Sequence, residues 1–230
     1  MERSAKQGRP DRGGAARRKL LAAAIDVFGR LGFDGACTRA LADAAGVNLQ
    51  AIPYYFGGKE GLYLAAAEHI AALIGTHTFD LRERVRSRLD EAVKHATPLK
   101  VYEARSLLTE IVQTLATLFV SRESEAWARF IIREQMEPTA AFSRLYEGAM
   151  KPGMEVTRRL LAEILGERAD SELVRLRTLS LIGSILVFRM AHATAMAELG
   201  WKSVGRRELD VVRNHCAELV AAISRPEASA

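Results

Sequence analysis

The chain has 230 residues, a formal net charge of +5 and 49% hydrophobic residues, enough for a packed core in one large domain or in a small domain joined to a larger one. Two cysteines, Cys37 and Cys216, imply no disulfide framework, and we expect Cys37 to be buried rather than redox-active. The five histidines lack metal-binding spacing, so neither a metal site nor a cofactor is indicated.

The N-terminal segment carries the charge excess. Residues 1–19 contain seven basic and two acidic side chains, which accounts for the whole net charge. A Gly- and Arg-rich segment of this kind cannot bury enough apolar surface to fold, so we expect a disordered arm over residues 1–15. Two interpretations stay open: an arm that neutralises phosphates or enters a minor groove, and a plain solvated tail. No apolar run follows that would make it a signal peptide.

The first predicted helix runs from Ala16 to Leu31. Its apolar residues recur at three to four residue intervals, which places them on one face, and Gly32 is placed to end the helix. We interpret it as a supporting helix for the segment that follows.

Residues 38–59, TRALADAAGVNLQAIPYYFGGK, predict two short helices joined by a glycine turn. Thr38 is suited to cap the first helix, and Gly46 takes a left-handed conformation at no steric cost where that helix must end. Asn48 is suited to cap the second helix, and the small Ala42 leaves room for a steep crossing. The order of these features predicts a DNA-reading helix-turn-helix. An ordinary helical hairpin in a core is the alternative, but it would not explain the residues expected to be exposed: Arg39, Leu49, Gln50, Tyr54 and Lys59.

The rest of the chain also predicts helices. They span residues 59–76, 78–95, 99–120, 124–136, 139–165, 171–199 and 206–223, with Pro and Gly between several of them. We therefore expect an all-α protein: a three-helix DNA-binding headpiece over residues 16–75, and a larger helical domain for effector binding and dimerisation over residues 76–225. The boundary is expected near Gly75 to Thr78.

The last two predicted helices, residues 171–199 and 206–223, differ from the others. Thr178 to Met196 is apolar on nearly every side, so it must be covered on more than one face. Arg189 interrupts that run well before a membrane span is reached, and we expect a soluble, cytoplasmic, nucleoid-associated protein. The apolar residues of 206–223 step like a heptad seam. The two helices predict a homodimer interface, although the seam could also pack within one chain.

Three segments carry a family resemblance. The helix with Phe28, the segment TRALADAAGV and the segment YYFGGKEGLYLAA resemble the headpiece of the TetR family of bacterial regulators. IPYYFGGKEGLYLA, FIIREQMEPTAAF and the Gly200-Trp201 pair are similar to its CecR-like (YbiH-type) branch. The resemblance implies a ligand-responsive repressor that binds a palindromic operator in double-stranded DNA, is released by a small-molecule effector and controls efflux or drug-response genes.

The same resemblance assigns roles to individual residues. It implies base contacts by Arg39, Leu49, Gln50 and Ala51, and phosphate contacts by Thr38 and Lys59. Arg39 suits a guanine edge and Gln50 an adenine edge. We add Tyr54, Tyr55, Arg17 and Arg18 as candidate phosphate contacts. Pro53 departs from the family, in which a phosphate-contacting tyrosine often occupies this position, and it removes a backbone donor from the recognition helix.

The effector region is less sharply marked. Family members hold small, often hydrophobic ligands in the C-terminal domain, which directs attention to aromatic and charged residues there, although each also fits an ordinary core. The candidates are Tyr102, Trp127, Phe130, Arg133, Glu134, Phe142, Tyr146, Phe188, Arg189 and Met196. Because a buried guanidinium needs a partner, we expect Arg189 to pair with Glu134.

Two other functions remain alternatives. One is a constitutive or activating DNA-binding regulator without an effector. The other is a helical enzyme or small-molecule carrier, but no catalytic set occurs at a defensible spacing, and the Gly57-Gly58 pair lacks the preceding strand of a phosphate loop.

Overall fold

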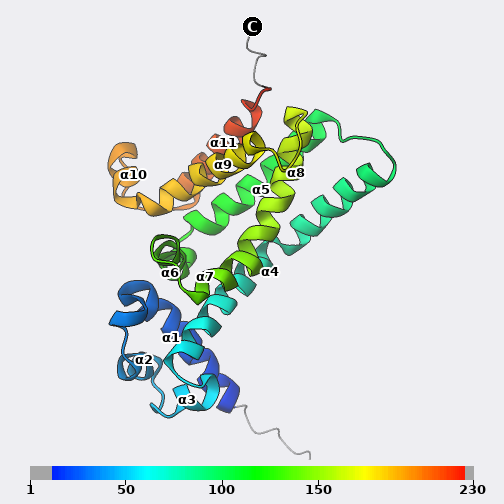
Figure 1. Ribbon diagram of the computed structural model, residues 1–230. Coiled ribbons are helices and arrows are strands. Elements are labelled where there is room, and N and C mark those ends of the chain that lie inside the picture. The colour runs from blue at the N-terminus through cyan, green and yellow to red at the C-terminus, as the bar shows by residue number, and fades with distance from the viewer. Residues whose placement is uncertain (1–11, 226–230) are drawn as a thin grey trace, which may run out of the picture.

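The computed structural model describes residues 12–225, and within that range every regular element is helical. Figure 1 shows a small group of helices, α1 to α3, at one end of the molecule and a larger bundle at the other, with α4 running from the first into the second. This arrangement confirms the all-α prediction of a headpiece with a larger helical C-terminal part.

The first helix, α1, spans Arg12–Gly35 and begins four residues earlier than predicted. Residues 12–15 of the predicted arm are therefore helical, and residues 1–11 lie outside the described residues. Gly32 has φ 75° and ψ −179°, which breaks the helix where the sequence indicated. That conformation is open to glycine and strained for residues with a Cβ.

The helices α2, Thr38–Ala45, and α3, Ala51–Phe56, follow, and α4 then spans Lys59–Lys94. The sequence predicted two helices in place of α4, which was wrong. Gly75 lies inside the helix, where a glycine costs only about 1 kcal/mol relative to alanine. The expected domain boundary thus falls within a continuous helix, and the division at residue 75 stays a prediction.

Six helical segments form the middle of the chain. They are α5 (Val101–Val120), the 3₁₀ turn η1 (Arg122–Ser124), α6 (Glu125–Met136), α7 (Ala140–Leu145) and α8 (Lys151–Leu165), with the π-helical segment η2 (Tyr146–Met150) between α7 and α8. The single helix predicted over 139–165 is therefore continuous but changes its winding at η2.

The C-terminal helices are α9 (Glu172–Met190), α10 (His192–Leu199) and α11 (Arg206–Ala221). The one helix predicted over 171–199 is two, because the chain bends by 83° at Ala191. Figure 1 shows α10 projecting from the bundle. No single helix among the described residues is long and apolar enough to cross a membrane, and α9 and α10 pass that test only together, across the bend.

Two hydrophobic cores hold the molecule together. The first joins α1 to α4 with residues of α6, α7 and η2, so the headpiece shares its core with these segments. The second joins the far half of α4 with α5, α8, α9 and α11. The heptad seam of α11 belongs to this second core: Val212, Cys216 and Val220 are buried there, and α11 packs chiefly on α5. The sequence left open whether this seam packs against a second copy or inside one chain. In the structure it packs inside the chain.

Candidate functional site

The turn between α2 and α3 is built by local caps. Cys37, rather than Thr38, is the N-cap of α2, and its Sγ accepts a hydrogen bond from the Ala40 backbone N–H at 3.4 Å. Cys37 is exposed, so the expectation of burial was wrong. As the N-cap, its side chain turns back to the backbone N–H groups at the start of α2 and does not enter the core. Thr38 is the first residue of the helix. Gly46 ends α2 in the left-handed conformation, φ 61° and ψ 40°, as its position indicated.

The start of α3 explains why Pro53 is tolerated. Asn48 Oδ1 accepts from the Gln50 backbone N–H at 2.8 Å and so holds the turn that leads into α3. The N-cap of α3 itself is Gln50, two residues after the predicted cap. Pro53 is the third residue of α3, within the first turn, where backbone N–H groups have no partner inside the helix. The expected loss of a donor inside the recognition helix therefore costs little.

One face of α3 is anchored and the other is free. Ile52 is fully buried in the first core, and Ala51 packs partly against the same core. Leu49, Gln50 and Pro53 are exposed, and Tyr54 is 80% exposed. Arg39, on α2, is exposed as well. Ile52 anchors α3, while Arg39 of α2 and Leu49 and Gln50 of the turn before α3 face solvent.

Three of the predicted phosphate-contacting residues are cations of α1 and α4. Lys59 begins α4, and its Nζ lies 4.4 Å from the centre of the Phe33 ring. The Arg17 guanidinium lies 5.3 Å from the Phe56 ring, and Arg18 is exposed. Such cation–π contacts hold a charge at a defined place without neutralising it. The remaining phosphate candidate, Tyr55, is half-buried and packs edge-to-face on Tyr54 at 4.7 Å.

A buried polar cluster lies behind the headpiece. Glu134 of α6 is fully buried, and its carboxylate accepts a 2.5 Å hydrogen bond from the Tyr63 hydroxyl of α4. The backbone N–H and the hydroxyl of Thr139 also donate to it, each at 3.0 Å. Burial and the neighbouring carboxylate raise the pKa of Tyr63. The sequence analysis selected Glu134 but missed Tyr63. Tyr63 lies on the apolar face of α4, and no neighbouring residue in the sequence indicates that its hydroxyl has a buried partner.

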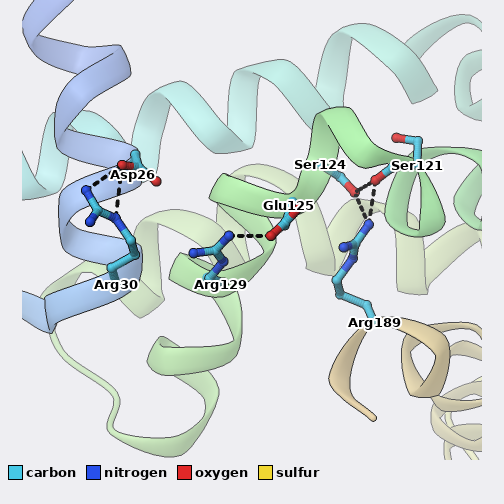
Figure 2. Close-up of polar contacts among 7 residues, drawn as sticks. All are labelled: Asp26, Arg30, Ser121, Ser124, Glu125, Arg129 and Arg189. Atoms are coloured by element: carbon cyan, nitrogen blue, oxygen red, sulfur yellow. Dashed lines mark hydrogen bonds and ion pairs between the residues drawn. The ribbon is translucent and has the colours of Figure 1, made fainter. Parts of the chain in front are cut away.

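The expected pairing of Arg189 with Glu134 is wrong. Arg189 donates to the carbonyl oxygens of Phe119 (2.9 Å) and Ser121 (2.5 Å) and to the Ser124 hydroxyl (3.1 Å). Figure 2 shows it reaching the Ser121–Ser124 turn. Burial lowers the pKa of its guanidinium. The carbonyls at the end of α5 have no partner inside the helix, so they accept the charge in place of a carboxylate.

The other effector candidates are scattered. Trp127 and Phe130 belong to the core shared with the headpiece, Phe188 packs partly against the second core, and Tyr102 is 70% exposed. Phe142 and Tyr146 stack at 5.8 Å and are half-buried, as is Met196.

Of the ten candidates, Arg133 lines a surface groove. This groove lies between α1 and α6 and has a volume of 350 Å³. A larger groove of 820 Å³ lies between α4 and the α7–η2 segment, and none of the candidates lines it. The structure therefore does not gather the ten candidates into one cavity.

An exposed helix-turn-helix, fixed to a larger helical body by a shared core, defines a DNA-binding regulator. Comparison with known proteins places it in a family. Residues 20–66 match the bacterial regulatory proteins of the tetR family, and residues 104–225 match the C-terminal domain of the HTH-type transcriptional dual regulator CecR. The chain belongs to the TetR family, in its CecR-like branch.

Individual relatives agree with this assignment. CecR of Shigella flexneri is 35% identical over 203 residues, which cover 87% of each chain. RutR of Escherichia coli K12 is 39% identical over 64 residues, 27% of this chain and 30% of RutR. Two crystal structures share the fold: the hemolysin II regulator HlyIIR (TM-score 0.57, 18% identity, 88% of this chain and 97% of that one) and Bacillus subtilis FadR with stearoyl-CoA (TM-score 0.55, 15% identity, 89% and 97%).

Proposed function

We propose that the chain is a homodimeric, ligand-responsive repressor that binds a palindromic DNA operator. The observation that carries the proposal is the exposed helix-turn-helix, in which Arg39 of α2 and Gln50 at the start of α3 face solvent while the fully buried Ile52 anchors α3. Arg39 and Gln50 read base edges, with Leu49 and Ala51 in apolar contact, and Thr38 and Lys59 hold phosphates. Tyr54, Tyr55, Arg17 and Arg18 add further phosphate contacts.

The dimer is proposed from an uncovered apolar face of the C-terminal helices. Leu176, Leu179, Val187 and Met190 of α9, Leu199 of α10 and Val211 of α11 are each 46 to 59% exposed. Exposed apolar side chains gathered in this way favour burial against a second copy. A two-fold dimer would present its recognition helices about 34 Å apart, one turn of duplex.

The test is a mobility-shift assay on operator fragments with the double variant Arg39→Ala, Gln50→Ala. Each lost bidentate base contact costs about 1–3 kcal/mol, so sequence preference should fall by about 100-fold while weak general binding remains. Arg168→Ala, in the loop before α9, is the matched control and should bind like the parent. Unchanged sequence preference in the double variant would show that these residues are not the readers.

Effector response is the second part of the proposal. A ligand releases the operator only if it binds one arrangement of the recognition helices more tightly than the other. The Shigella relative is described as a dual regulator, so a regulator that also activates remains the alternative. Transcription measured from the operator with and without effector separates repression from activation.

A further inference from the structure

The groove between α1 and α6 has features of a binding site distinct from the dimer face and the DNA-reading face. It is lined by Gly29 of α1 and by Arg129, Ile132, Arg133, Met136 and Glu137 of α6 and its end. At Gly29 the two helices touch, because a Cβ there would lie 2.9 Å from the Ala126 carbonyl oxygen. Any molecule in the groove therefore contacts the headpiece and the C-terminal part at once.

The arginines near the groove differ in their partners. Arg30 pairs with Asp26 at 2.7 Å, and Arg129 pairs with Glu125; Figure 2 shows both pairs. Within residues 12–225 Arg133 has no carboxylate within 4.0 Å, its buried Nε has no partner, and its one hydrogen bond reaches the Arg30 carbonyl at 3.4 Å.

A guanidinium has five N–H donors. A partly buried one with a single long bond is incompletely compensated. The groove therefore contains a guanidinium with N–H donors that lack a protein acceptor, and an anion could accept from them.

The walls of the groove narrow the class of that anion. Ile132 and the 73% exposed Met136 add apolar surface beside Arg133. Glu137 adds one negative charge at the rim, which repels a multiply charged ligand. We propose that this groove binds a small monocarboxylate with a short apolar body, its carboxylate held by Arg133 and its apolar part against Ile132 and Met136.

The binding has a regulatory consequence that rests on the proposed function. A ligand that bridges α1 and α6 stabilises one orientation of the headpiece relative to the C-terminal bundle. In a two-fold dimer that orientation sets the spacing of the recognition helices. Occupancy of the groove then changes operator affinity by the ratio of ligand affinities for the two orientations.

Calorimetric titration of the full chain with sodium hexanoate, at ionic strength held constant with NaCl, tests the site. Hexanoate should bind, whereas inorganic phosphate and neutral 1-hexanol should bind at least 10-fold more weakly. Arg133→Gln should weaken hexanoate about 10- to 100-fold, the range for a charge-assisted hydrogen bond. Met136→Asp, at a 73% exposed position that contributes little to the core, should weaken it too. Val93→Asp adds the same charge to a 74% exposed residue of α4 and should leave binding unchanged.

Three results overturn the proposal: no hexanoate binding by the parent chain, parent-like binding by Met136→Asp, or phosphate binding as tight as hexanoate. Operator affinity with and without hexanoate then tests the regulatory consequence, which fails if the two are equal. A chain that binds hexanoate through Arg133 but binds no DNA would refute the proposed function and leave the site intact.

Discussion

The hydrogen bond between Tyr63 and Glu134 offers a direct measure of how firmly α4 is held to α6. Tyr63→Phe removes the hydroxyl and leaves the ring, which packs edge-to-face on Phe28 at 4.7 Å and tilted on Phe130 at 4.8 Å. Glu134 then keeps only its Thr139 donors in a fully buried position. A hydrogen bond to a charged group contributes about 1.5–3 kcal/mol, so we expect the free energy of unfolding to fall by about 2 kcal/mol.

Urea unfolding of the full chain measures this change. For a chain of this size the melting temperature should fall by about 4–8 °C. Tyr102→Phe is the matched control, because Tyr102 is 70% exposed and its change should stay within about 0.5 kcal/mol. A Tyr63→Phe loss equally small would refute the view that this hydrogen bond holds α4 to α6.

The same variant has a predicted pH signature. Folding raises the pKa of Tyr63, so its proton is held more tightly in the folded state. The stabilisation is complete below the unfolded tyrosine pKa of about 10 and is lost as the pH rises above that value toward the folded pKa. Parent and variant should therefore converge in stability above about pH 10, and a constant difference from pH 7 to 11 would contradict the assignment.

Three further substitutions test local features. Cys37→Ser replaces a weak sulfur cap by a hydroxyl and should raise the unfolding free energy by about 0.5 kcal/mol, measured by urea unfolding. Gly46→Ala meets no atom within 4 Å, so its cost is conformational, about 1 kcal/mol in the same assay. Arg189→Leu removes the guanidinium donor from the Phe119 and Ser121 carbonyls, which keep the Ser124 hydroxyl as a donor, and should lower the melting temperature by about 2–6 °C; no change would mean that water or the Ser124 hydroxyl replaces the guanidinium.

The helix-turn-helix was predictable because its signals are short-range. The stop at Gly46 acts within a few residues and is confirmed, and Asn48 accepts a hydrogen bond in the turn just before α3, although the N-cap of α3 is Gln50. The exchange of Thr38 for Cys37 as the cap is a shift of one residue, the usual uncertainty at a helix end. Pro53 does remove a backbone donor from α3, and its position in the first turn, which the exact helix start decides, makes that loss a small one.

The bend at Ala191 and the continuity of α4 were not predictable in this way. Ala191 is a good helix former, so no local residue marks the bend there. Gly75 does mark a break by composition, but its cost of about 1 kcal/mol is smaller than the gain from burying the helix on both sides of it, as at Ile74. In both places tertiary packing decides against local preference.

The partners of half-buried arginines are the hardest feature to infer, because backbone carbonyls occur at every residue. Arg105 donates to the carbonyls of Val220 and Ala221 at the end of α11, at 2.6 and 3.1 Å, and Arg189 does the same at the end of α5. Each makes several short bonds to carbonyls that a helix end leaves free, which accounts for its charge without a ligand.

Arg133 also reaches a carbonyl, that of Arg30, two residues before the break at Gly32. It makes one bond at 3.4 Å where the others make several at 2.5 to 3.1 Å. Helix capping therefore explains Arg105 and Arg189 and only partly explains Arg133. That difference is why an anion is expected beside Arg133 and not beside the other two.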